Sequence, residues 1–325
     1  MIKKWKKRFS LLQKQLLLIL YYSTKIKWTF SKSEDKKKII ICFDGLFSHG
    51  GLVDRLKGII SFYEVAKKLD YDFYIYFKHP FELTLFLKPN KISWEISKEQ
   101  LRYNLFESKV IYLMNNFSAN PISLIENCKA KTVFVYCNID YLGVIYNDKK
   151  QEELDDIWKS NYNDLFSVSD LLQDQINQLP SKKGIVFHSR FTSLMGDFKD
   201  STSFSLEIES RQKLIFELIK IMKKKSLSYP DKKIYVLSDS IFFLNYIKEH
   251  TSFNVLSGTP KHIDVNNNEM ELTSHIKTFT DFYFMSKCDG LYLLKLNQMH
   301  ASNFSKYAGI LGKVPFAILK NDQTN

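Results

Sequence analysis

Short apolar, β-rich runs alternate with helical stretches along most of the chain, and this alternation limits the folds that it can adopt. The first strand-like run is Lys38–Phe43, and a helical pattern over 51–69 follows it. A second series begins with Gly184–Ser189 and ends with a strand over 314–319. Strands that alternate with helices predict parallel sheets covered by helices on both faces. With 325 residues the chain has room for two such domains, and we therefore expect an α/β protein with two Rossmann-like domains.

The expected organisation has three parts. A basic amphipathic leader covers 1–37, an N-terminal Rossmann-like domain covers 38–180, and a C-terminal one covers 181–325. The second boundary is placed after Pro180, where a short polar stretch breaks the pattern. Ligands of open α/β sheets bind beyond the carboxyl ends of the strands. Candidate functional residues are therefore expected in the loops that follow the strands.

The positive charge of the chain is concentrated at its start. The formal net charge is +12, and residues 1–38 carry +10 of it, with twelve Lys and Arg against two acids. The rest of the chain is nearly neutral, so the sequence does not predict the broad basic face of a protein that binds nucleic acid.

The leader also carries apolar residues at helical spacing. They are Trp5, Phe9, Leu12, Leu16 and Ile19. The longest apolar run, over 16–22, has seven residues, whereas a bilayer span needs about 20. We expect an amphipathic helix that lies on an anionic membrane surface; the alternative is a helix that docks on the protein's own body.

The four cysteines are Cys42, Cys128, Cys137 and Cys288. They lie far apart without a CxxC pair, and three of them have apolar, strand-like surroundings. This pattern predicts buried, reduced thiols and a protein of a reducing compartment rather than a disulfide framework or a zinc site.

The first candidate constellation follows the first strand. Gly50 and Gly51 can bring backbone close to a ligand and open a helix with unpaired N–H groups. His49 precedes them, and Asp54 and Arg55 come in the first turn of that helix. The plainer alternative is a glycine-rich turn followed by a surface arginine.

Two further constellations stand at strand ends in the second half. His188 and Arg190 end the strand Gly184–Ser189, where an arginine can meet a bound phosphate with its planar fork. Asp239 follows the strand Lys233–Ser238 and can accept hydrogen bonds from a ribose or a base. The alternatives are a core histidine, a surface arginine and a helix cap.

A fourth constellation precedes the last helix. Ser302 and Ser305 stand where a loop enters that helix, which is a suitable seat for a pyrophosphate, although Ser302 can equally be an ordinary cap. The Asp70-Tyr71-Asp72 triplet favours a turn over a metal site. The histidines are too scattered for zinc, and no Walker loop occurs.

Taken in order, these segments resemble the inverting GDP-fucose fucosyltransferases, a superfamily that includes α1,6-, α1,2- and protein O-fucosyltransferases. The matching pieces are GGLVDRLKG, HSR followed by GD, VLSDS, and DFYFMSKC with SNFSKYAGILGKVP. They span nearly all of 38–319. Two departures are the longer gap between Arg190 and Gly196-Asp197 and the single acid in VLSDS.

The resemblance implies a GT-B arrangement, with GDP-fucose bound by the C-terminal domain and the acceptor by the N-terminal one. Arg190 would neutralise the departing pyrophosphate, with His188 beside it, and Asp239 would read the nucleoside. Ser302 and Ser305 would contact the phosphates, while Gly50, Gly51 and Arg55 would line the cleft. Neither a divalent metal nor a further cofactor is implied, because an arginine and a helix N-terminus supply the positive charge.

The expected reaction is a single displacement at the anomeric carbon with inversion, assisted by a general base that could be His49, Asp54 or Glu82. The leader and the reduced thiols suggest an enzyme of a bacterial surface glycan such as lipopolysaccharide, peripheral on the cytoplasmic face of the membrane. The alternatives are a transferase for another nucleotide sugar, a non-catalytic membrane-surface binding protein on the same fold, and an RNA-binding protein that uses the leader.

Overall fold

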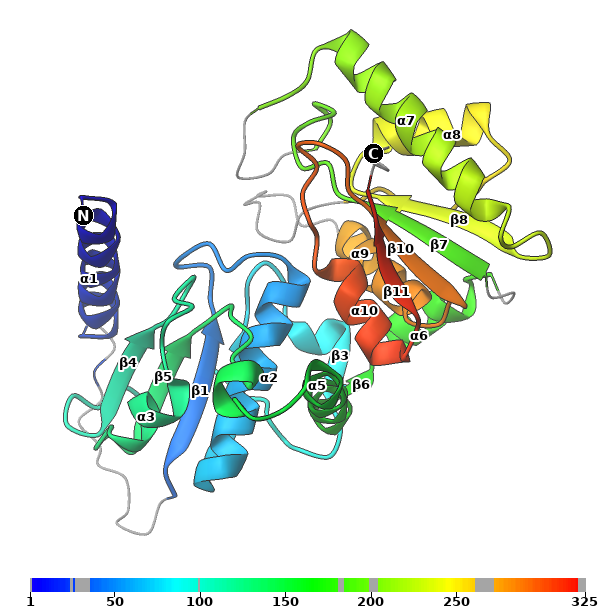
Figure 1. The fold of residues 1–325 in the computed structure, drawn as a ribbon. Helices are drawn as coiled ribbons and strands as arrows, with labels where there is room; N and C mark the ends of the chain where they lie inside the picture. The colour runs from blue at the N-terminus through cyan, green and yellow to red at the C-terminus, as the bar shows by residue number, and fades with distance from the viewer. Residues whose placement is uncertain are drawn as a thin grey trace. The chain divides into compact units, whose positions relative to one another are not determined.

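The computed structural model describes residues 2–23, 26, 36–98, 100–180, 184–198, 204–260 and 272–320, without the side chains of 2–11 and 272–274. The chain divides into two compact units, Met1–Ser167 and Val168–Asn325 (Figure 1). Each unit is built around its own parallel sheet, so each is described by itself below.

The first unit, Met1–Ser167, has a sheet of four parallel strands in the order β2-β1-β5-β4. Its elements in chain order are α1 (Ile2–Ser23), β1 (Lys38–Phe43), α2 (Leu52–Leu69), β2 (Asp72–Phe77), the 3-10 turn η1 (Leu83–Leu85), β3 (Leu87–Pro89), β4 (Ser108–Tyr112), α3 (Pro121–Glu126), β5 (Thr132–Tyr136), α4 (Leu142–Ile145), α5 (Gln151–Leu165) and β6 (Phe166–Val168). β1 lies in the middle of the sheet, and its residues from Ile39 to Phe43 are buried, as the near-continuous apolar run of a parallel strand predicts.

Helix α2 packs on this sheet, and a glycine allows the close approach. A Cβ atom on Gly58 would lie 2.2 Å from the carbonyl oxygen of Cys137, just past the end of β5. A side chain of any size would therefore push the helix off the sheet. The short strands β3 and β6 pair with each other in a separate small sheet.

The second half of α1 docks on this unit next to β4. Leu18 and Tyr22 are buried in a cluster that includes Ile40 and Phe134. The side chain of Gln15 donates a hydrogen bond to the carbonyl oxygen of Val110 (2.6 Å), and its own carbonyl accepts the N–H of Tyr112 (3.0 Å). The glutamine thus pairs with the backbone of β4 as a neighbouring strand would.

The apolar stripe noted in the sequence is not the docking face of α1. Leu12, Leu16 and Ile19 are 62%, 54% and 42% exposed, whereas the docked residues lie on the adjacent side of the helix. The side chains of Trp5 and Phe9 fall outside the described residues. Helix α1 therefore docks on the body of the protein, as the alternative to membrane binding predicted. The described part of the apolar stripe, on which the prediction of membrane binding depended, is still exposed.

The second unit, Val168–Asn325, has five parallel strands in the order β11-β10-β7-β8-β9. Its elements are α6 (Asp170–Asn177), β7 (Gly184–Ser189), α7 (Ile208–Ser226), β8 (Lys233–Ser238), α8 (Ile241–His250), β9 (Asn254–Val255), α9 (Leu272–Met285), β10 (Gly290–Leu294), α10 (Phe304–Gly312) and β11 (Phe316–Leu319). Numbered within the unit, the strand order is 5-4-1-2-3, which is the Rossmann order read from the other edge.

Helices cover both faces of this sheet. α7 and α8 bury apolar side chains against one face, in a cluster with Phe187 and Val236. α9 and α10 cover the other face, where Phe284 packs against Tyr235, and α6 packs on α9. The prediction of parallel α/β units is confirmed.

The observed units meet at Ser167/Val168, whereas the sequence placed this boundary after Pro180. The difference is α6, which the sequence assigned to the first half and which packs against α9 of the second. α3, α4 and the β3–β6 pair were not foreseen.

Among the described helices, none combines the length and the low polarity that a bilayer span requires. All four cysteines are buried, and none of them forms a disulfide, as the sequence predicted.

Candidate functional site

The carboxyl edge of the second sheet contains a topological switch point. From β7 the chain continues through β8 to β9 on one side, while β10 and β11 lie on the other. Ligands of open α/β sheets bind in the crevice where the strand order reverses in this way. The loops that follow β7, β8 and β10 meet there, and they carry most of the candidate residues.

Arg190 directly follows β7 and is held in place by an aspartate and an aromatic ring. Its Nε lies 3.3 Å from Oδ2 of Asp239, and its guanidinium lies 4.8 Å from the ring centre of Phe198. The side chain is 19% exposed. An arginine that is fixed by two partners and still reaches the surface is suited to bind an anion there.

Asp239 follows β8 and organises the loop after β7. Its two carboxylate oxygens accept the backbone N–H groups of Phe191 and Thr192, each at 2.8 Å. Thr192 has a left-handed backbone conformation, with φ of 57°, which such local bonds help to hold. Burial raises the pKa of Asp239 above its ordinary value, although Arg190 and the two N–H groups oppose this effect. The helix cap is the neighbouring Ser240, which accepts the N–H of Phe243, and not Asp239 as one interpretation held.

His188 and Ser305 form a buried link between β7 and α10. Nδ1 of His188 lies 3.1 Å from the hydroxyl of Ser305, and both residues are buried. Burial, assisted by the charge of Arg190, lowers the pKa of His188 to about 3. The imidazole is therefore neutral near pH 7 and connects two elements of the edge. Contact of either side chain with a ligand stays a prediction.

The loop after β10 adjoins Arg190 through the backbone. The N–H of His300 donates to the carbonyl oxygen of Arg190 (3.2 Å). Two residues later, Ser302 accepts the N–H of Phe304 (3.1 Å) at the start of α10. Ser302 is partly exposed; its hydroxyl lies at the start of α10, where Asn303 is the N-cap residue, on the same edge as the arginine.

Asp197, part of the GD segment, joins the loop after β7 to helix α8. One of its oxygens accepts the hydroxyl of Ser240 (3.0 Å) and the N–H of Phe242 (2.6 Å). Asp197 is further from Arg190 in the sequence than in the motif, and it thus lies at the N-terminus of a helix, which a carboxylate stabilises.

Ser189, the last residue of β7, is buried, and its hydroxyl has no hydrogen-bond partner among the described residues.

The candidates of the first unit lie after β1 and at the start of α2. Arg55 is fully buried and donates to the carbonyl oxygens of Gly50 (3.0 Å) and His79. Its guanidinium lies 5.0 Å from the ring centre of Phe77. In this structure Arg55 joins two loops, and its contact with a ligand stays a prediction.

Two glycines open α2 beside Asp54. Gly50 has φ of +79°, and a Cβ there would lie 3.0 Å from the Asp54 carboxylate, while Gly51 is the N-cap residue. Asp54 is 43% exposed and forms an ion pair with Lys57 (2.9 Å). Glu82, the other carboxylate considered as a base, is 56% exposed and pairs with Lys78 (2.8 Å).

His49 is buried next to a carboxylate, Asp44, that is not among the predicted site residues. Its Nε2 accepts the N–H of Gly45 (3.1 Å) and lies 3.8 Å from Oδ1 of Asp44. Asp44 also accepts the hydroxyl of Tyr136 (2.7 Å). Its position directly after β1 was the only signal that could have identified it.

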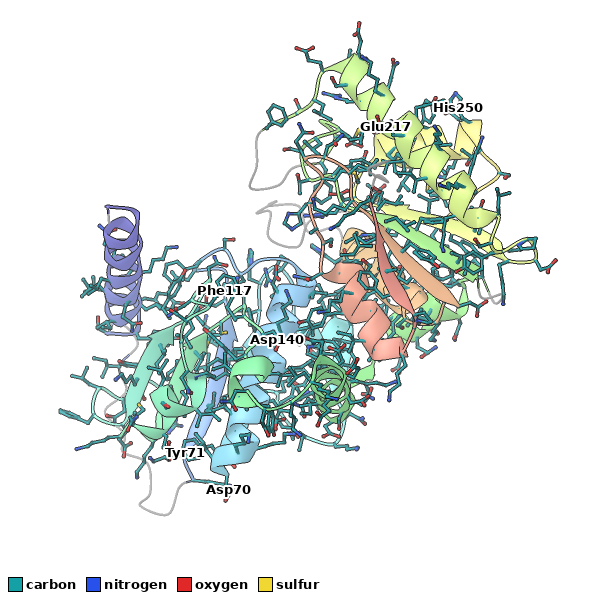
Figure 2. The ribbon with its side chains drawn as sticks, viewed as in Figure 1. Asp70, Tyr71, Phe117, Asp140, Glu217 and His250 are labelled. Atoms are coloured by element: carbon teal, nitrogen blue, oxygen red, sulfur yellow. The ribbon has the colours of Figure 1, made fainter. Side chains whose placement is uncertain are left out.

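The Asp70-Tyr71-Asp72 triplet behaves as a turn. Asp70 ends α2 in a left-handed conformation, is 91% exposed and pairs with Lys36 (2.7 Å); Figure 2 labels Asp70 and Tyr71 at that helix end. Within the described ranges no group of three or more His, Cys, Asp or Glu side chains could hold a metal ion. Independence from a metal stays a prediction.

No protein-family model matches the sequence, and no curated protein matches it either. The structure does resemble solved ones. A mutant of FUT1 from Arabidopsis thaliana, in complex with GDP, has a TM-score of 0.58 and 14% identity, over 91% of this chain and 72% of that one. The fucosyltransferase NodZ from Bradyrhizobium has a TM-score of 0.54 and 16% identity, over 89% and 97%. NodZ α-1,6-fucosyltransferase co-crystallised with GDP has a TM-score of 0.54 and 17% identity, over 90% of this chain and 96% of that one.

We expect Asp239→Asn to destabilise the protein by about 1–3 kcal/mol, because one amide oxygen cannot accept both N–H groups and Arg190 loses its charged partner. Urea denaturation measures the loss. Asp289→Asn is the matched control, since Asp289 forms a partly exposed ion pair with Lys232, a type worth about 0–1 kcal/mol. Equal, small effects of the two substitutions would show that Asp239 does not hold the loop.

On the likeness of the whole chain to these solved structures, the protein has the fold of these fucosyltransferases, as the sequence motifs predicted.

Proposed function

We propose that this protein is a glycosyltransferase that transfers fucose from GDP-fucose to a glycan acceptor, with inversion and without a metal ion. The observation that carries the proposal is Arg190, held by Asp239 and Phe198 at the switch point of the second sheet. The likeness of fold supports it, because the similar structures include one soaked with GDP-fucose and others with GDP.

The chemistry assigned to Arg190 follows from the charge that the reaction produces. As the bond between the sugar and the diphosphate breaks, negative charge grows on the leaving phosphate. A guanidinium that is already oriented stabilises this charge without reorganising. The N-terminus of α10, which starts beside Ser302, adds a second source of positive potential on the same edge.

Arg190→Lys is expected to lower the transfer rate by ~10²–10³, the usual loss when one such donor is removed. Lysine keeps the charge but lacks the planar fork that can bind two phosphate oxygens. The rate is measured as GDP release from GDP-fucose, with and without acceptor. Arg102→Lys, at an exposed position of the first unit, is the control. A near-normal rate in the Arg190 variant, with an unchanged melting temperature, would refute the assignment.

A thermal-shift panel of GDP, UDP, CDP and dTDP, each with and without EDTA, tests the nucleotide and the metal together. GDP at 100 times its Kd should stabilise the protein by ~2.7 kcal/mol. The other nucleotides, at the same concentration as GDP, should stabilise it by less. EDTA should leave the shift unchanged. A larger shift with UDP would favour a transferase for another nucleotide sugar. No shift with any nucleotide would favour a non-catalytic binding protein on the same fold.

We also propose that α1 attaches the protein to the cytoplasmic face of an anionic membrane, as suits an enzyme of a bacterial surface polysaccharide such as lipopolysaccharide. Leu12, Leu16 and Ile19 are exposed although the helix is docked. The same helix carries six Lys and Arg residues, and 1–38 carry +10. An apolar stripe with many cations is the pattern of a helix that lies in the headgroup region.

Replacing Leu12, Leu16 and Ile19 together by serine should weaken binding to phosphatidylglycerol vesicles by roughly tenfold or more, because the variant buries less apolar area in the bilayer. Sedimentation with vesicles measures the bound fraction. The control replaces Leu105, Phe117 and Leu124, which are exposed elsewhere on the same unit; Figure 2 labels Phe117. Equal binding of both variants, or binding to RNA that depends on 1–35, would contradict the proposal.

A further inference from the structure

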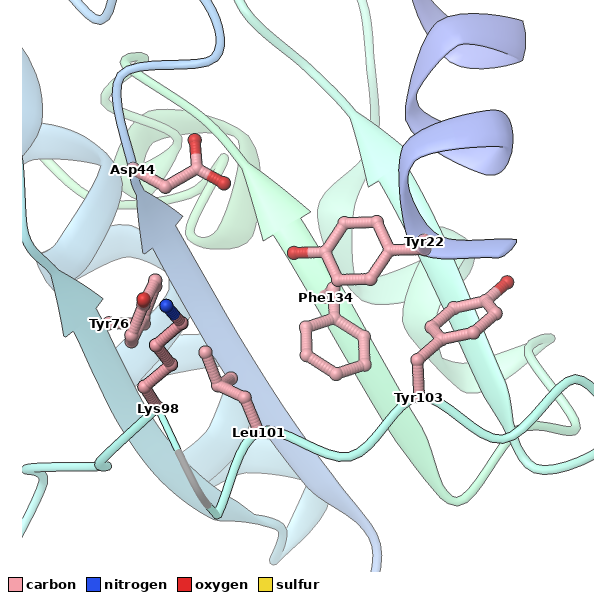
Figure 3. Close-up of a pocket in the computed structure, with 7 residues that line it drawn as sticks. All are labelled: Tyr22, Asp44, Tyr76, Lys98, Leu101, Tyr103 and Phe134. Carbon is pink, nitrogen blue, oxygen red and sulfur yellow. The ribbon is translucent and has the colours of Figure 1, made fainter. Parts of the chain in front are cut away.

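A pocket lies in the first unit between α1 and the face of the sheet. Its volume is about 290 Å³. The lining residues come from α1, from β2 and β5, from the end of β1 and from the segment over 98–103, and they are Tyr22, Asp44, Tyr76, Lys98, Leu101, Tyr103 and Phe134 (Figure 3). Nothing in the function proposed for Arg190 uses this pocket, which belongs to the other unit.

The period of the strands explains why a carboxylate reaches this face. Side chains alternate along a strand, so Asp44 continues the side of the sheet on which Ile40 and Cys42 lie. Those two residues belong to the buried cluster beneath α1. Asp44 is 7% exposed, so it presents a nearly dry carboxylate at the edge of an aromatic cavity.

The walls are mostly aromatic. The ring of Tyr22 lies 4.9 Å from that of Phe134 and 5.1 Å from that of Tyr103. In Figure 3 these three rings lie on one side, and Tyr76, Lys98 and Leu101 lie on the other. Such flat walls suit a ligand with a flat, weakly polar face.

The phenols of the pocket and its carboxylate are hydrogen-bonding groups that keep their protonation state near pH 7. Burial raises the pKa of Tyr22, Tyr76 and Tyr103, so these phenols retain their protons. Burial also acts to raise the pKa of Asp44, but His49, the Tyr136 hydroxyl and a backbone N–H together hold it below its ordinary value. Asp44 is therefore an acceptor, while the phenols can donate or accept.

These features disfavour charged ligands and ligands that are wholly apolar. A diphosphate or a fatty acid would bring its anion close to the buried Asp44 carboxylate. A hydrocarbon chain would remove the remaining water from that carboxylate without offering a hydrogen bond. An organic cation would meet the ammonium group of Lys98 in the same pocket. A neutral ring with hydroxyl groups on its edge and C–H groups on its faces meets every requirement.

We propose that this pocket binds one sugar ring, as a subsite for the acceptor glycan, with Asp44 accepting hydrogen bonds from the sugar hydroxyls and the aromatic rings contacting its C–H face. A volume of about 290 Å³ suits a single ring. The role as acceptor subsite rests on the proposed transferase function, whereas binding of the sugar is measurable without turnover.

The test is saturation-transfer NMR on the full chain, with the methyl glycosides of glucose, galactose and mannose as probes. At least one should bind the unmodified protein. Leu101→Trp fills the pocket without removing a polar group, and Asp44→Asn removes the charged acceptor. Each should weaken binding by roughly tenfold or more, the effect of losing one hydrogen bond to a charged group or of blocking the site.

Leu105→Trp is the matched control, since Leu105 is exposed and does not line the pocket, and it should bind the probe as the unmodified protein does. Melting temperatures show whether each variant folds, and Leu101→Trp keeps the test decisive if Asp44→Asn does not. No binding of any methyl glycoside, equal binding by Leu101→Trp, or binding of decanoate in their place would overturn the proposal.

The GDP thermal shift separates this proposal from the transferase function. Leu101→Trp should keep the full GDP shift, because the expected donor residues belong to the other unit. If a glycoside binds but GDP causes no shift, the sugar pocket stands and the transferase function fails. If GDP causes a shift but no glycoside binds, the transferase function stands and the pocket proposal fails.

Discussion

The carboxylate of Asp239 holds together the edge of the second unit on which the proposed function depends. It accepts two backbone N–H groups from the loop after β7 and lies 3.3 Å from Nε of Arg190. The N–H of His300 in turn donates to the carbonyl oxygen of Arg190, and Asp197 accepts the N–H of Phe242 at the start of α8. The three strand-end loops therefore support one another. An arginine held in this way loses little conformational freedom when it meets an anion, which favours binding.

In the first unit, two adjacent sides of helix α1 have different surroundings. The docked side of this helix supplies Gln15, Leu18 and Tyr22 to the body of the unit, and Tyr22 also forms a wall of the pocket. The adjacent side leaves Leu12 and Leu16 exposed. Membrane attachment and sugar binding are thus proposed for two sides of one helix, which would bring an acceptor on a membrane close to the pocket.

Much of the fold could be predicted from the sequence because its signals are local. The bounds of β1, β7 and β8 agree with the apolar runs that predicted them, since central parallel strands are apolar on both faces. The elements that were missed, α3, α4 and the β3–β6 pair, have three to six residues each. Such short elements depend on contacts with distant segments, which no local pattern records.

The sequence by itself determined the alternation of strands and helices, the strand-end positions of Arg190 and Asp239, and the concentration of positive charge before residue 39. Only the tertiary structure decided which partners these groups have. Arg55, in the first turn of α2, is buried between two loops, and Asp44 faces a pocket, although Asp44 follows a strand as Arg190 does. The reason is that the direction of a side chain at a strand end depends on the loops and helices packed around it, and these come from segments far away in the chain.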